Sequence, residues 1–335
     1  MNRTPIDSPL AGPNRLITLA HDAPPADYPS ATLSNDFVKL NLYLPDERHG
    51  FYRGSRFDRS GMVASATWNG HTFFGPWNDA PADPFHHDHV QGTAEEFSMD
   101  DPPGFSRAAV NESFLKIGVG LLRRPNEHPY AFHKRYAITD PGRWEVHIND
   151  ACTDIAFEHV ITDQLGWAYR YRKQIELLAD QPGFVIRRTL ENTGTRRIDT
   201  LHYGHNFIAI DDQQLGPGWE LRLPYEVTVK DPNKLHGYVA VDGRAVSVQT
   251  PIPAGKSAWA EFVAGGELSS PDAPFTMSVT DPAGTSVQID LDPAPQFVRL
   301  FATPRVICPE GFVRIIANPG EVFAWSSRYL FSTPA

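Results

Sequence analysis

The sequence predicts an all-β protein built as a large antiparallel sandwich. Short apolar stretches with period-two alternation follow one another along the 335 residues, and Pro, Gly, Asn and Asp separate them. No window of ten or more residues shows a helical period. Alternation of this kind is typical of strands with one buried face, so stacked antiparallel sheets are expected. Because no linker or fixed repeat divides the chain, we expect a single domain over residues 1–335.

The N-terminal quarter of the sequence already shows the alternation of strands and turns. Residues 1–33 are rich in proline and predict an arm, with an early strand at 15–20. Strands at 61–68 and 71–74 flank Asn69-Gly70, a dipeptide typical of two-residue hairpin turns. Residues 35–45 alternate, so one face of that strand carries four apolar side chains: Val38, Leu40, Leu42 and Leu44.

The rest of the chain continues in the same way. Asp242-Gly243 and Pro282-Ala283-Gly284 stand where hairpin turns are needed. The further strands are expected at 114–122, 144–148, 156–162, 168–178, 184–191, 199–210, 219–224, 237–241, 245–249, 258–264, 275–280, 286–291, 297–301, 312–317 and 322–331.

Composition and charge exclude several classes of protein. Hydrophobic residues make up 41% and charged residues 21%, which excludes a disordered, collagen-like or coiled-coil chain. The net charge is −10 and no Lys/Arg block occurs, so we expect no nucleic-acid or anionic-membrane partner. The N-terminus lacks the apolar core of a signal peptide, and no run of 18 apolar residues occurs. A cytoplasmic protein is therefore expected, and a homodimer stays open.

The two cysteines support the same compartment. Cys152 and Cys308 form neither a disulfide framework nor a metal-binding pattern, although one bridge between them stays open. Unpaired thiols are typical of a reducing cytoplasm.

Two histidines lie inside one expected strand, in the stretch Leu201-His202-Tyr203-Gly204-His205-Asn206-Phe207-Ile208. Alternation places His205 on one face with Tyr203 and Phe207, and His202 on the other. A single buried histidine is more often a packed side chain than a reactive one. Aromatic neighbours instead favour a sugar-binding face, because the apolar faces of sugars stack on aromatic rings.

A carboxylate and an arginine are further candidates. Glu310 stands between an apolar stretch and the strand at 312–317, and Glu is rarely buried without a partner, although a solvated turn explains it equally well. The segment Tyr52-Arg53-Gly54-Ser55-Arg56-Phe57-Asp58 places two planar donor forks beside a turn, where they could hold hydroxyls or form a surface salt bridge. A phosphorylated sugar would need a basic pocket, for which the candidates are Arg53, Arg56 and Arg305.

A histidine-rich loop, His86-His87-Asp88-His89-Val90-Gln91-Gly92, precedes Glu95 and Glu96. These residue types suit a transition metal such as zinc. Acidic, His-rich loops are often only solvated, and no cysteine or assured third ligand completes a site. We therefore predict no metal here, and assign His89 and Gln91 to hydrogen bonds at a pocket rim.

Three stretches, taken in order, resemble the galactose mutarotase-like superfamily, which includes the aldose 1-epimerases. The Arg56 segment resembles the strand that donates a substrate-binding arginine, and His205-Asn206-Phe207 resembles the His-x-aromatic motif of the general acid. Pro309-Glu310 followed by Asn318-Pro319-Gly320-Glu321 resembles the closing pattern, in which a catalytic Glu precedes a Pro-Gly-Glu turn and a last strand. The similarity spans roughly residues 35–333. The usual Thr-x-His-x-Tyr-Phe is replaced, so His202 stays an alternative to His205 as the acid.

The resemblance implies a β-supersandwich fold and an isomerase that interconverts the anomers of a sugar by opening its ring. Glu310 would remove the proton of the O1 hydroxyl, and His205 would protonate the ring oxygen O5. No cofactor is needed for this chemistry. The substrate would be held by five further side chains: Arg56, His89, Gln91, His202 and Tyr203.

Two alternatives remain open from the sequence. A lyase or isomerase acting on a keto-sugar or uronate could use the same scaffold, and the histidine-rich loop with a metal is its main support. A non-catalytic carbohydrate-binding protein would bind sugar without accelerating anomer exchange. The sequence does not identify the sugar, nor whether it is neutral, acidic or phosphorylated.

Overall fold

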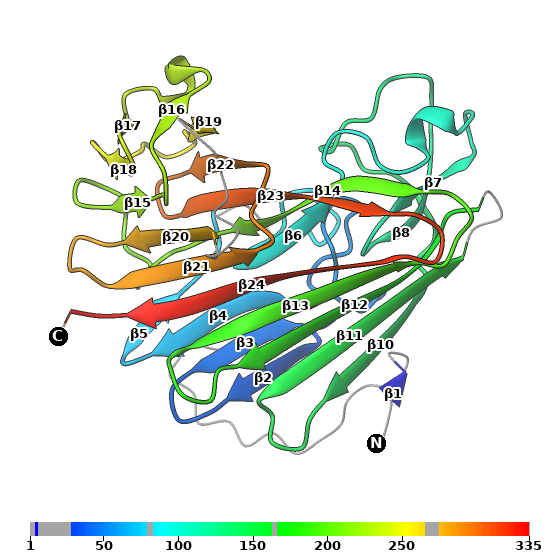
Figure 1. Ribbon diagram of the computed structural model, residues 1–335, viewed down its shortest axis with the longest axis horizontal. Coiled ribbons are helices and arrows are strands. Elements are labelled where there is room, and N and C mark those ends of the chain that lie inside the picture. The colour runs from blue at the N-terminus through cyan, green and yellow to red at the C-terminus, as the bar shows by residue number, and fades with distance from the viewer. Residues whose placement is uncertain (1–3, 6–27, 79–82, 163–165, 265–274, 335) are drawn as a thin grey trace.

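The structure is a computed structural model that describes residues 4–5, 28–78, 83–162, 166–264 and 275–334. Strands dominate these residues, and all the strand pairs in them are antiparallel (Figure 1). The two helical segments described, η1 (Phe105–Arg107) and η2 (Pro232–Leu235), are short 3₁₀ turns. The expected all-β antiparallel sandwich is therefore confirmed. Within the described residues, no helix has the length and apolar character needed to cross a membrane.

The largest sheet runs through the whole molecule and has 11 strands. Its strand order places a middle segment of the chain beside the C-terminal one, since β13 (Gly183–Asn192) pairs with β24 (Val322–Ser332). In spatial order its strands are β1 (Thr4–Pro5), β10 (Arg143–Ile148), β11 (Asp154–Thr162), β12 (Ala168–Leu177), β13 (Gly183–Asn192), β24 (Val322–Ser332), β21 (Ser286–Asp292), β20 (Phe275–Thr280), β15 (Glu220–Arg222), β18 (Ala245–Val248) and β17 (Val239–Asp242).

Three smaller sheets complete the fold. A 6-stranded sheet contains β16 (Val227–Val229), β19 (Ala258–Ala264), β22 (Phe297–Ala302), β23 (Ile307–Ala317), β14 (Ile198–Asn206) and β6 (Thr93–Phe97). A 4-stranded sheet contains β2 (Ser30–Ser34), β3 (Lys39–Tyr43), β4 (Met62–Trp68) and β5 (His71–Phe73). A 3-stranded sheet contains β7 (Ser113–Lys116), β8 (Gly120–Arg123) and β9 (Ile138–Asp140).

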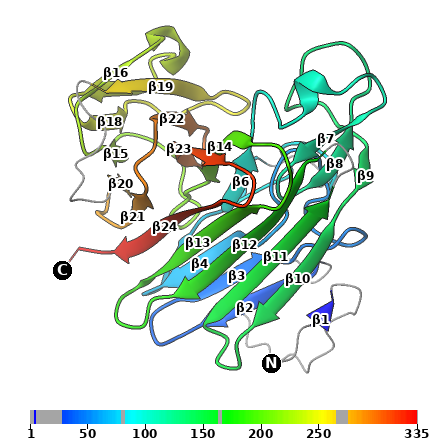
Figure 2. The same ribbon diagram turned by 45° about the vertical axis from the view of Figure 1, so that its right-hand side comes forward.

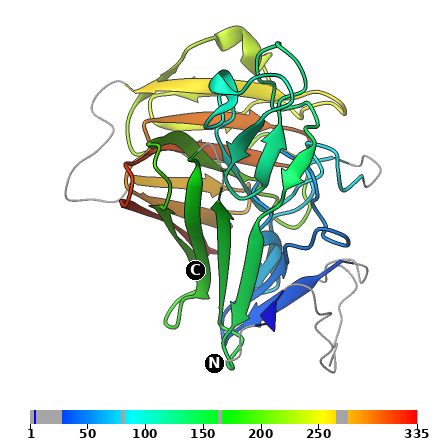
Figure 3. The ribbon, with the colours of Figure 1, turned by 90° about the vertical axis from the view of Figure 1, so that its right-hand side faces the viewer.

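The core forms where these sheets face one another. Strands β2–β4 form a layer against β10–β13 (Figures 2 and 3). Alternate side chains of β11 and β12 are buried, and Phe157 and Ile175 from these strands join Leu40 and Val63 in one apolar cluster. Burial of every second residue is the reason that the period-two pattern of the sequence predicted these strands. The 6-stranded sheet continues above this sandwich and carries the site described below (Figure 1).

Some strand boundaries differ from those expected. The stretch 114–122 is not one strand but the hairpin of β7 and β8, because Gly118 has a φ of 76° and the Val119 amide donates to the carbonyl of Lys116. Residues 30–33, expected in the arm, belong to β2, which pairs with β3. The early strand expected at 15–20 lies outside the described residues.

Two differences matter for the site. Strand β23 begins at Ile307 rather than at 312, so Glu310 lies within a strand and not in a solvated turn. Strand β6 was not expected at all, because its sequence Thr-Ala-Glu-Glu-Phe places two adjacent carboxylates where a strand prefers apolar residues. All five of its residues are buried.

The cysteines form no bridge. Cys152 is exposed, Cys308 is buried, and both are free thiols. The disulfide that the sequence left open is therefore not made in this structure.

Candidate active site

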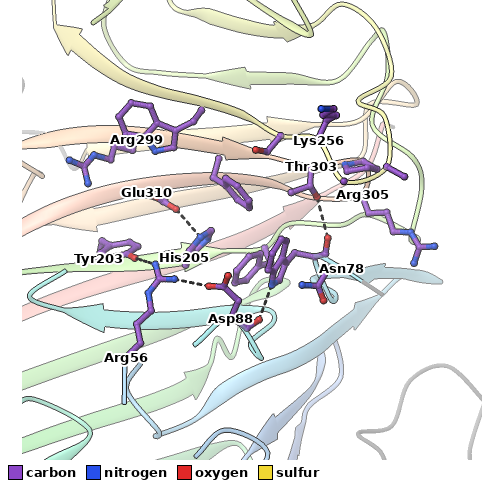
Figure 4. Close-up of a pocket in the computed structure, with 18 of the residues that line it drawn as sticks. Arg56, Asn78, Asp88, Tyr203, His205, Lys256, Arg299, Thr303, Arg305 and Glu310 are labelled. Atoms are coloured by element: carbon purple, nitrogen blue, oxygen red, sulfur yellow. Dashed lines mark hydrogen bonds and ion pairs between the residues drawn. The ribbon is translucent and has the colours of Figure 1, made fainter. Parts of the chain in front are cut away.

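A cavity of about 880 Å³ lies beside strands β14, β22 and β23 (Figure 4). This volume is in the range of pockets that bind small molecules. Segments far apart in the sequence supply its walls, so only the folded chain assembles it. Its lining residues include several with a charged or ionisable side chain: Arg56, Asp88, Tyr203, His205, Asp212, Lys256, Arg299, Arg305 and Glu310.

The register between β14 and β23 brings His205 and Glu310 together. His202 pairs with Val313, and further along the same two segments Ile208 pairs with Ile307. This constant antiparallel register places His205 directly opposite Glu310. Their side chains meet in the cavity, with His205 Nε2 3.2 Å from Glu310 Oε1.

Burial determines the protonation of this pair. Both side chains are almost completely buried. Loss of solvation raises the pKa of Glu310 to about 8. Loss of solvation, and then the nearby Arg56 cation, lowers the pKa of His205 well below its usual range. At neutral pH the pair therefore holds one proton, on the carboxyl group, and is a neutral contact rather than an ion pair.

One nitrogen of His205 remains available. Its Nδ1 atom is buried and has no hydrogen-bond partner among the described residues. Buried polar atoms are nearly always paired, and an unpaired one at a cavity wall is a candidate ligand contact.

Arg56 lies beside the pair and is held on three sides. Its Nε donates to Glu96 Oε2 at 2.8 Å, one terminal nitrogen donates to Asp88 Oδ1 at 2.7 Å, and the other donates to the Tyr203 hydroxyl at 3.1 Å. Its guanidinium also stacks between two rings, with Cζ 4.4 Å from the centre of Phe57 and 4.3 Å from that of Phe132. Burial lowers the pKa of Arg56, but the carboxylate of Glu96 and its other partners raise it overall, so the group stays charged.

Glu96 on β6 is the common acceptor behind Arg56. Its carboxylate accepts from Arg56, from the Tyr203 hydroxyl at 2.6 Å and from Lys116 Nζ at 3.0 Å. Burial raises the pKa of Glu96, but the Arg56 and Lys116 cations outweigh it and lower the pKa overall. This fixed carboxylate holds Arg56 and Tyr203 at the cavity wall.

Aromatic rings surround the histidine. The His205 ring stacks on Phe207 with centroids 4.1 Å apart and meets Phe301 edge-on at 5.4 Å. Trp77 lies 5.8 Å from Phe301, and its indole nitrogen donates to the carbonyl of Asp88 at 2.9 Å. Trp77, His205, Phe207 and Phe301 all line the cavity, so its wall beside the histidine is largely aromatic.

Four of the residues selected from the sequence meet in this cavity: Arg56, Tyr203, His205 and Glu310. Arg56 lies on the segment before β4, Tyr203 and His205 lie on β14, and Glu310 lies on β23. Figure 4 shows them converging on one side of the cavity.

His202 lies on the opposite face of β14. Its Nε2 is 3.0 Å from Glu95 Oε2, and the Trp325 indole donates to its Nδ1 at 3.1 Å, so both ring nitrogens are occupied in the interior. Burial lowers the pKa of His202 to about 4. The two assignments that the sequence left to His202, as substrate contact and as alternative acid, are therefore withdrawn.

His89 and Gln91 do not reach the cavity as the structure describes it. The His89 ring packs against Phe51 with centroids 4.3 Å apart. The Gln91 amide donates weakly to the Tyr43 hydroxyl at 3.4 Å and to the carbonyl of Ala64 at 3.5 Å. Both side chains complete the packing beside β3 and β4, so their assignment to substrate binding is also withdrawn.

The histidine-rich loop brings potential metal ligands together. Ligand atoms of His86, His87 and Asp88 lie within 4.8 Å of one another. However, Asp88 already pairs with Arg56 at 2.7 Å and with His87 at 2.9 Å. A metal here would displace these contacts and lie beside the Arg56 cation, which opposes metal binding electrostatically.

The sequence did not indicate two cationic residues of the wall, Lys256 and Arg299. Pro253-Ala254-Gly255-Lys256 is recognisable as a turn, and the Lys256 amide does donate to the carbonyl of Pro253. Its place over the cavity depends on the pairing of β19 with β22, which a single sequence does not reveal.

Comparisons with known proteins agree with this architecture. The sequence matches no protein-family model and no curated protein. Among solved structures, it is similar to the Slr1438 protein from Synechocystis sp. PCC 6803, with 14% identity, a TM-score of 0.57, and coverage of 92% of this chain and 97% of that one. It is also similar to a galactose mutarotase-like protein from Clostridium acetobutylicum (12% identity, TM-score 0.53, 92% and 99% covered). A GalM/aldose epimerase homologue from C. elegans matches with 10% identity, a TM-score of 0.51, and 92% and 100% covered. These likenesses show that the chain has the galactose mutarotase-like β-sandwich fold.

Proposed function

We propose that the protein is a carbohydrate-active isomerase of the aldose 1-epimerase type, which interconverts sugar anomers by acid–base ring opening. The observation that carries this proposal is the direct meeting of His205 and Glu310, 3.2 Å apart, in a cavity walled by aromatic rings. A sugar hemiacetal would enter between the two side chains and replace their mutual contact. Its apolar face would lie against the rings beside His205.

The chemistry needs one acid and one base. One group removes the proton of the O1 hydroxyl while the other protonates O5, and the C1–O5 bond breaks to give the open-chain aldehyde. After rotation about C1–C2, O5 attacks C1 from the other face, and both proton transfers run backwards. Each residue therefore donates and accepts once per turnover, which requires that the pair hold one proton in total.

The opposed pKa shifts of the pair supply that single proton. The sequence assigned Glu310 as the base and His205 as the acid. Before a sugar binds, the proton would lie on Glu310, because the pKa of Glu310 is raised and that of His205 is lowered. A bound sugar would contact both groups. During the proposed cycle the proton lies once on Glu310 and once on His205, and the cycle can begin from either state.

Arg56 and Tyr203 would orient the substrate and support charge. Both groups line the cavity beside the pair and are fixed from behind by Glu96. A fixed cation next to O1 stabilises the negative charge that develops as the O1 proton leaves. The proposed substrate is a free sugar or sugar derivative in the cytoplasm, and the reaction needs neither metal nor nucleotide.

A second candidate, a lyase or isomerase acting on an oxidised sugar, is favoured by one observation. Asp88, which belongs to the His86–His87–Asp88 cluster, also lines the cavity. This candidate predicts metal in the purified protein and an activity that a chelator removes. Metal analysis therefore separates the two proposals.

Anomer exchange measured by NMR on a panel of neutral, acidic and phosphorylated sugars tests the first proposal. Glu310→Gln and His205→Asn should each slow the exchange by about 10²–10⁴-fold, the usual contribution of a positioned acid or base. Matched controls are Glu226→Gln and His236→Asn, which change the same residue types at exposed positions outside the cavity. Full activity in both site variants would refute the proposed roles. Sugar binding without accelerated exchange would instead indicate a binding protein.

A further inference from the structure

The cavity extends across the sheet from the acid–base pair to β19. The 6-stranded sheet places β14, β23, β22 and β19 side by side in that order. One residue from each of these strands lines the cavity: His205, Glu310, Phe301 and Trp259. In Figure 4, Arg299 and Lys256 lie on the side of the cavity away from Arg56. Neighbouring strands are about 4.8 Å apart, so the three steps from β14 to β19 cover about 14 Å, which is more than one sugar ring.

The strand register sets Trp259 on the same face of the sheet as the pair. Trp259 pairs with Phe301, and Phe301 pairs with Cys308. Directly opposed residues of antiparallel strands project to one face, with their Cβ atoms about 4.5–5.5 Å apart. Cys308 shares this face with Glu310, because the two lie two residues apart on β23. Trp259 is therefore in line with the reactive carboxyl, two strands further across the sheet.

Aromatic rings connect the pair to Trp259. The His205 ring stacks on Phe207 with centroids 4.1 Å apart and meets Phe301 edge-on at 5.4 Å. Trp77 closes this group from the side, 6.4 Å from Phe207 and 5.8 Å from Phe301. All five of these residues line the cavity. An apolar surface of rings thus leads from the histidine, over Phe301, to Trp259.

The Trp259 ring is held in place and remains only half-buried. Lys234 Nζ lies 4.3 Å from the ring centre, and Arg299 Cζ lies 5.6 Å from it. Arg299 is itself fixed by Glu261 at 3.0 Å. Lys234 is not among the described lining residues, so its contact with the ring lies outside the cavity wall. An indole fixed in this way is a platform on which the apolar face of a sugar would stack.

Polar groups for sugar hydroxyls stand next to this platform. Ser257 and Lys256 belong to the turn before β19, and both line the cavity. Ser257 lies two residues before Trp259, the spacing at which extended side chains share a face. A hydroxyl both donates and accepts, and an ammonium donates, so these side chains suit the hydroxyls of a neutral sugar ring.

We propose that the Trp259 end of the cavity is a subsite for a second sugar unit, so that the substrate is a reducing disaccharide or a longer oligosaccharide. The inference rests on the proposed function, because it places the reducing-end ring, with its free O1 hydroxyl, at His205 and Glu310. The next ring would stack on Trp259, and the glycosidic bond would cross Phe301. The second ring contributes binding alone, and the bonds broken and formed are those of the proposed ring opening.

Calorimetry on the full-length protein with glucose, maltose, cellobiose and lactose tests the inference, because all four sugars have the same glucose ring at the reducing end. We expect at least one disaccharide to bind about tenfold more tightly than glucose, as one stacking contact on an aromatic ring provides. Equilibrium affinity does not depend on the rate of anomer exchange. The disaccharide with the largest preference identifies the linkage.

Trp259→Leu removes the ring and keeps an apolar side chain. In this variant the ratio of affinities between the preferred disaccharide and glucose should fall close to one. Trp259→Phe keeps a smaller ring and should give an intermediate ratio. Trp68→Leu is the matched control, because Trp68 on β4 is also half-buried but lies outside the cavity lining, and it should keep the parent ratio.

The indole N–H signal of Trp259 in the NMR spectrum of the parent protein gives a second reading, which does not require the leucine variant to fold. It is the signal that is missing from Trp259→Phe. Addition of the preferred disaccharide should shift this signal, and glucose should shift it much less.

Four results would overturn the inference: equal affinity for all four sugars, no binding of any, a preference that persists in Trp259→Leu, or a Trp259 signal that the disaccharide does not shift. A disaccharide preference without accelerated anomer exchange would refute the proposed function alone. Accelerated exchange of glucose with no disaccharide preference would refute the subsite alone.

Discussion

Glu95 and Glu96 are neighbours on β6, yet they serve two buried clusters that differ in how completely their charges are partnered. Because strand side chains alternate, one carboxylate points into the interior and the other towards the cavity. The interior cluster consists of Asp58, Glu95, Lys173, Arg188 and His202. The cavity cluster consists of Arg56, Glu96, Tyr203, His205 and Glu310.

The interior cluster is saturated. Arg188 donates to both oxygens of Glu95 at 2.7 and 2.8 Å, Lys173 approaches at 3.0 Å, and both nitrogens of His202 are bonded. Burial raises the pKa of Glu95, but Arg188 and Lys173 lower it well below its usual range overall. In such a cluster nothing remains to bind a substrate, so its role is to join β6, β12, β13 and β14.

In the cavity cluster, only the groups behind the cavity wall have all their hydrogen-bonding atoms occupied. Both oxygens of Glu96 accept hydrogen bonds. Within the described residues, the Glu310 side chain makes a polar contact with His205 alone, and His205 Nδ1 is unpaired. Incomplete partnering in a buried place shifts the pKa of Glu310 and His205 in opposite directions. In this comparison, the fully partnered ionisable groups lie in the interior, and the incompletely partnered ones line the cavity where the acid–base pair is proposed.

The largest expected effect is a difference in the free energy of unfolding when one carboxylate of each cluster is replaced. Glu95→Gln leaves Arg188 and Lys173 without their shared carboxylate, and breaking a buried ion pair costs about 3–5 kcal/mol in the free energy of unfolding. Glu310→Gln should cost much less, because Glu310 is largely uncharged at neutral pH. Urea unfolding at pH 7 measures both variants. Equal losses in the two variants would refute the contrast.

Two buried tyrosines give a finer comparison. The Tyr203 hydroxyl donates to Glu96 at 2.6 Å, and the Tyr171 hydroxyl donates to Asp58 at 3.0 Å. Phenylalanine at either position should cost about 1.5–3 kcal/mol of stability, the usual contribution of a hydrogen bond to a charged group. Only Tyr203→Phe should also slow anomer exchange, by about tenfold if one such contact orients Arg56. Exchange that slows equally in both variants would mean that stability alone explains the loss.

The smallest expected effect is a dependence of stability on pH. The folded protein holds a proton on Glu310 up to about pH 8, whereas the unfolded chain releases it near its ordinary value of 4.5. Stability from this group is therefore fully present below pH 4.5 and is lost as the pH rises towards 8. His205, with a lowered pKa, acts in the opposite direction, but only below its ordinary value of 6.5.

Between pH 6.5 and 8 only the Glu310 contribution of this pair remains. The free energy of unfolding should fall across this interval by at most about 2 kcal/mol, the limit for one proton over one and a half pH units. Glu310→Gln should flatten this fall. If the free energy of unfolding of Glu310→Gln depends on pH as steeply as that of the parent protein, the Glu310 carboxyl is not buried in its neutral form.

Much of the fold could be predicted from the sequence because alternation is a local signal. Asn69-Gly70 does form the β4–β5 hairpin, in which Trp68 pairs with His71, and both turn residues have positive φ. Strand β6 could not be predicted in this way, because Glu95 and Glu96 are compensated by cations from β7, β12 and β13.

The site could be predicted only in part, because it also depends on contacts between segments that are distant in the sequence. Alternation places His202 and His205 on opposite faces of β14, but both faces are buried, so the sequence cannot show which face meets the cavity. That choice depends on the register with β23, which sets Glu310 opposite His205. His89 and Gln91 were misjudged because polar residue types in a loop do not reveal the direction of their side chains.

The most direct test of the central claim is a double-mutant cycle on the rate of anomer exchange, using Glu310→Gln, His205→Asn and the variant with both changes. If the two side chains share one proton and act as a unit, the double variant should be about as slow as either single variant, because removing one partner already disables the other. Losses that multiply in the double variant would contradict the account, since they would show that the imidazole and the carboxyl act independently.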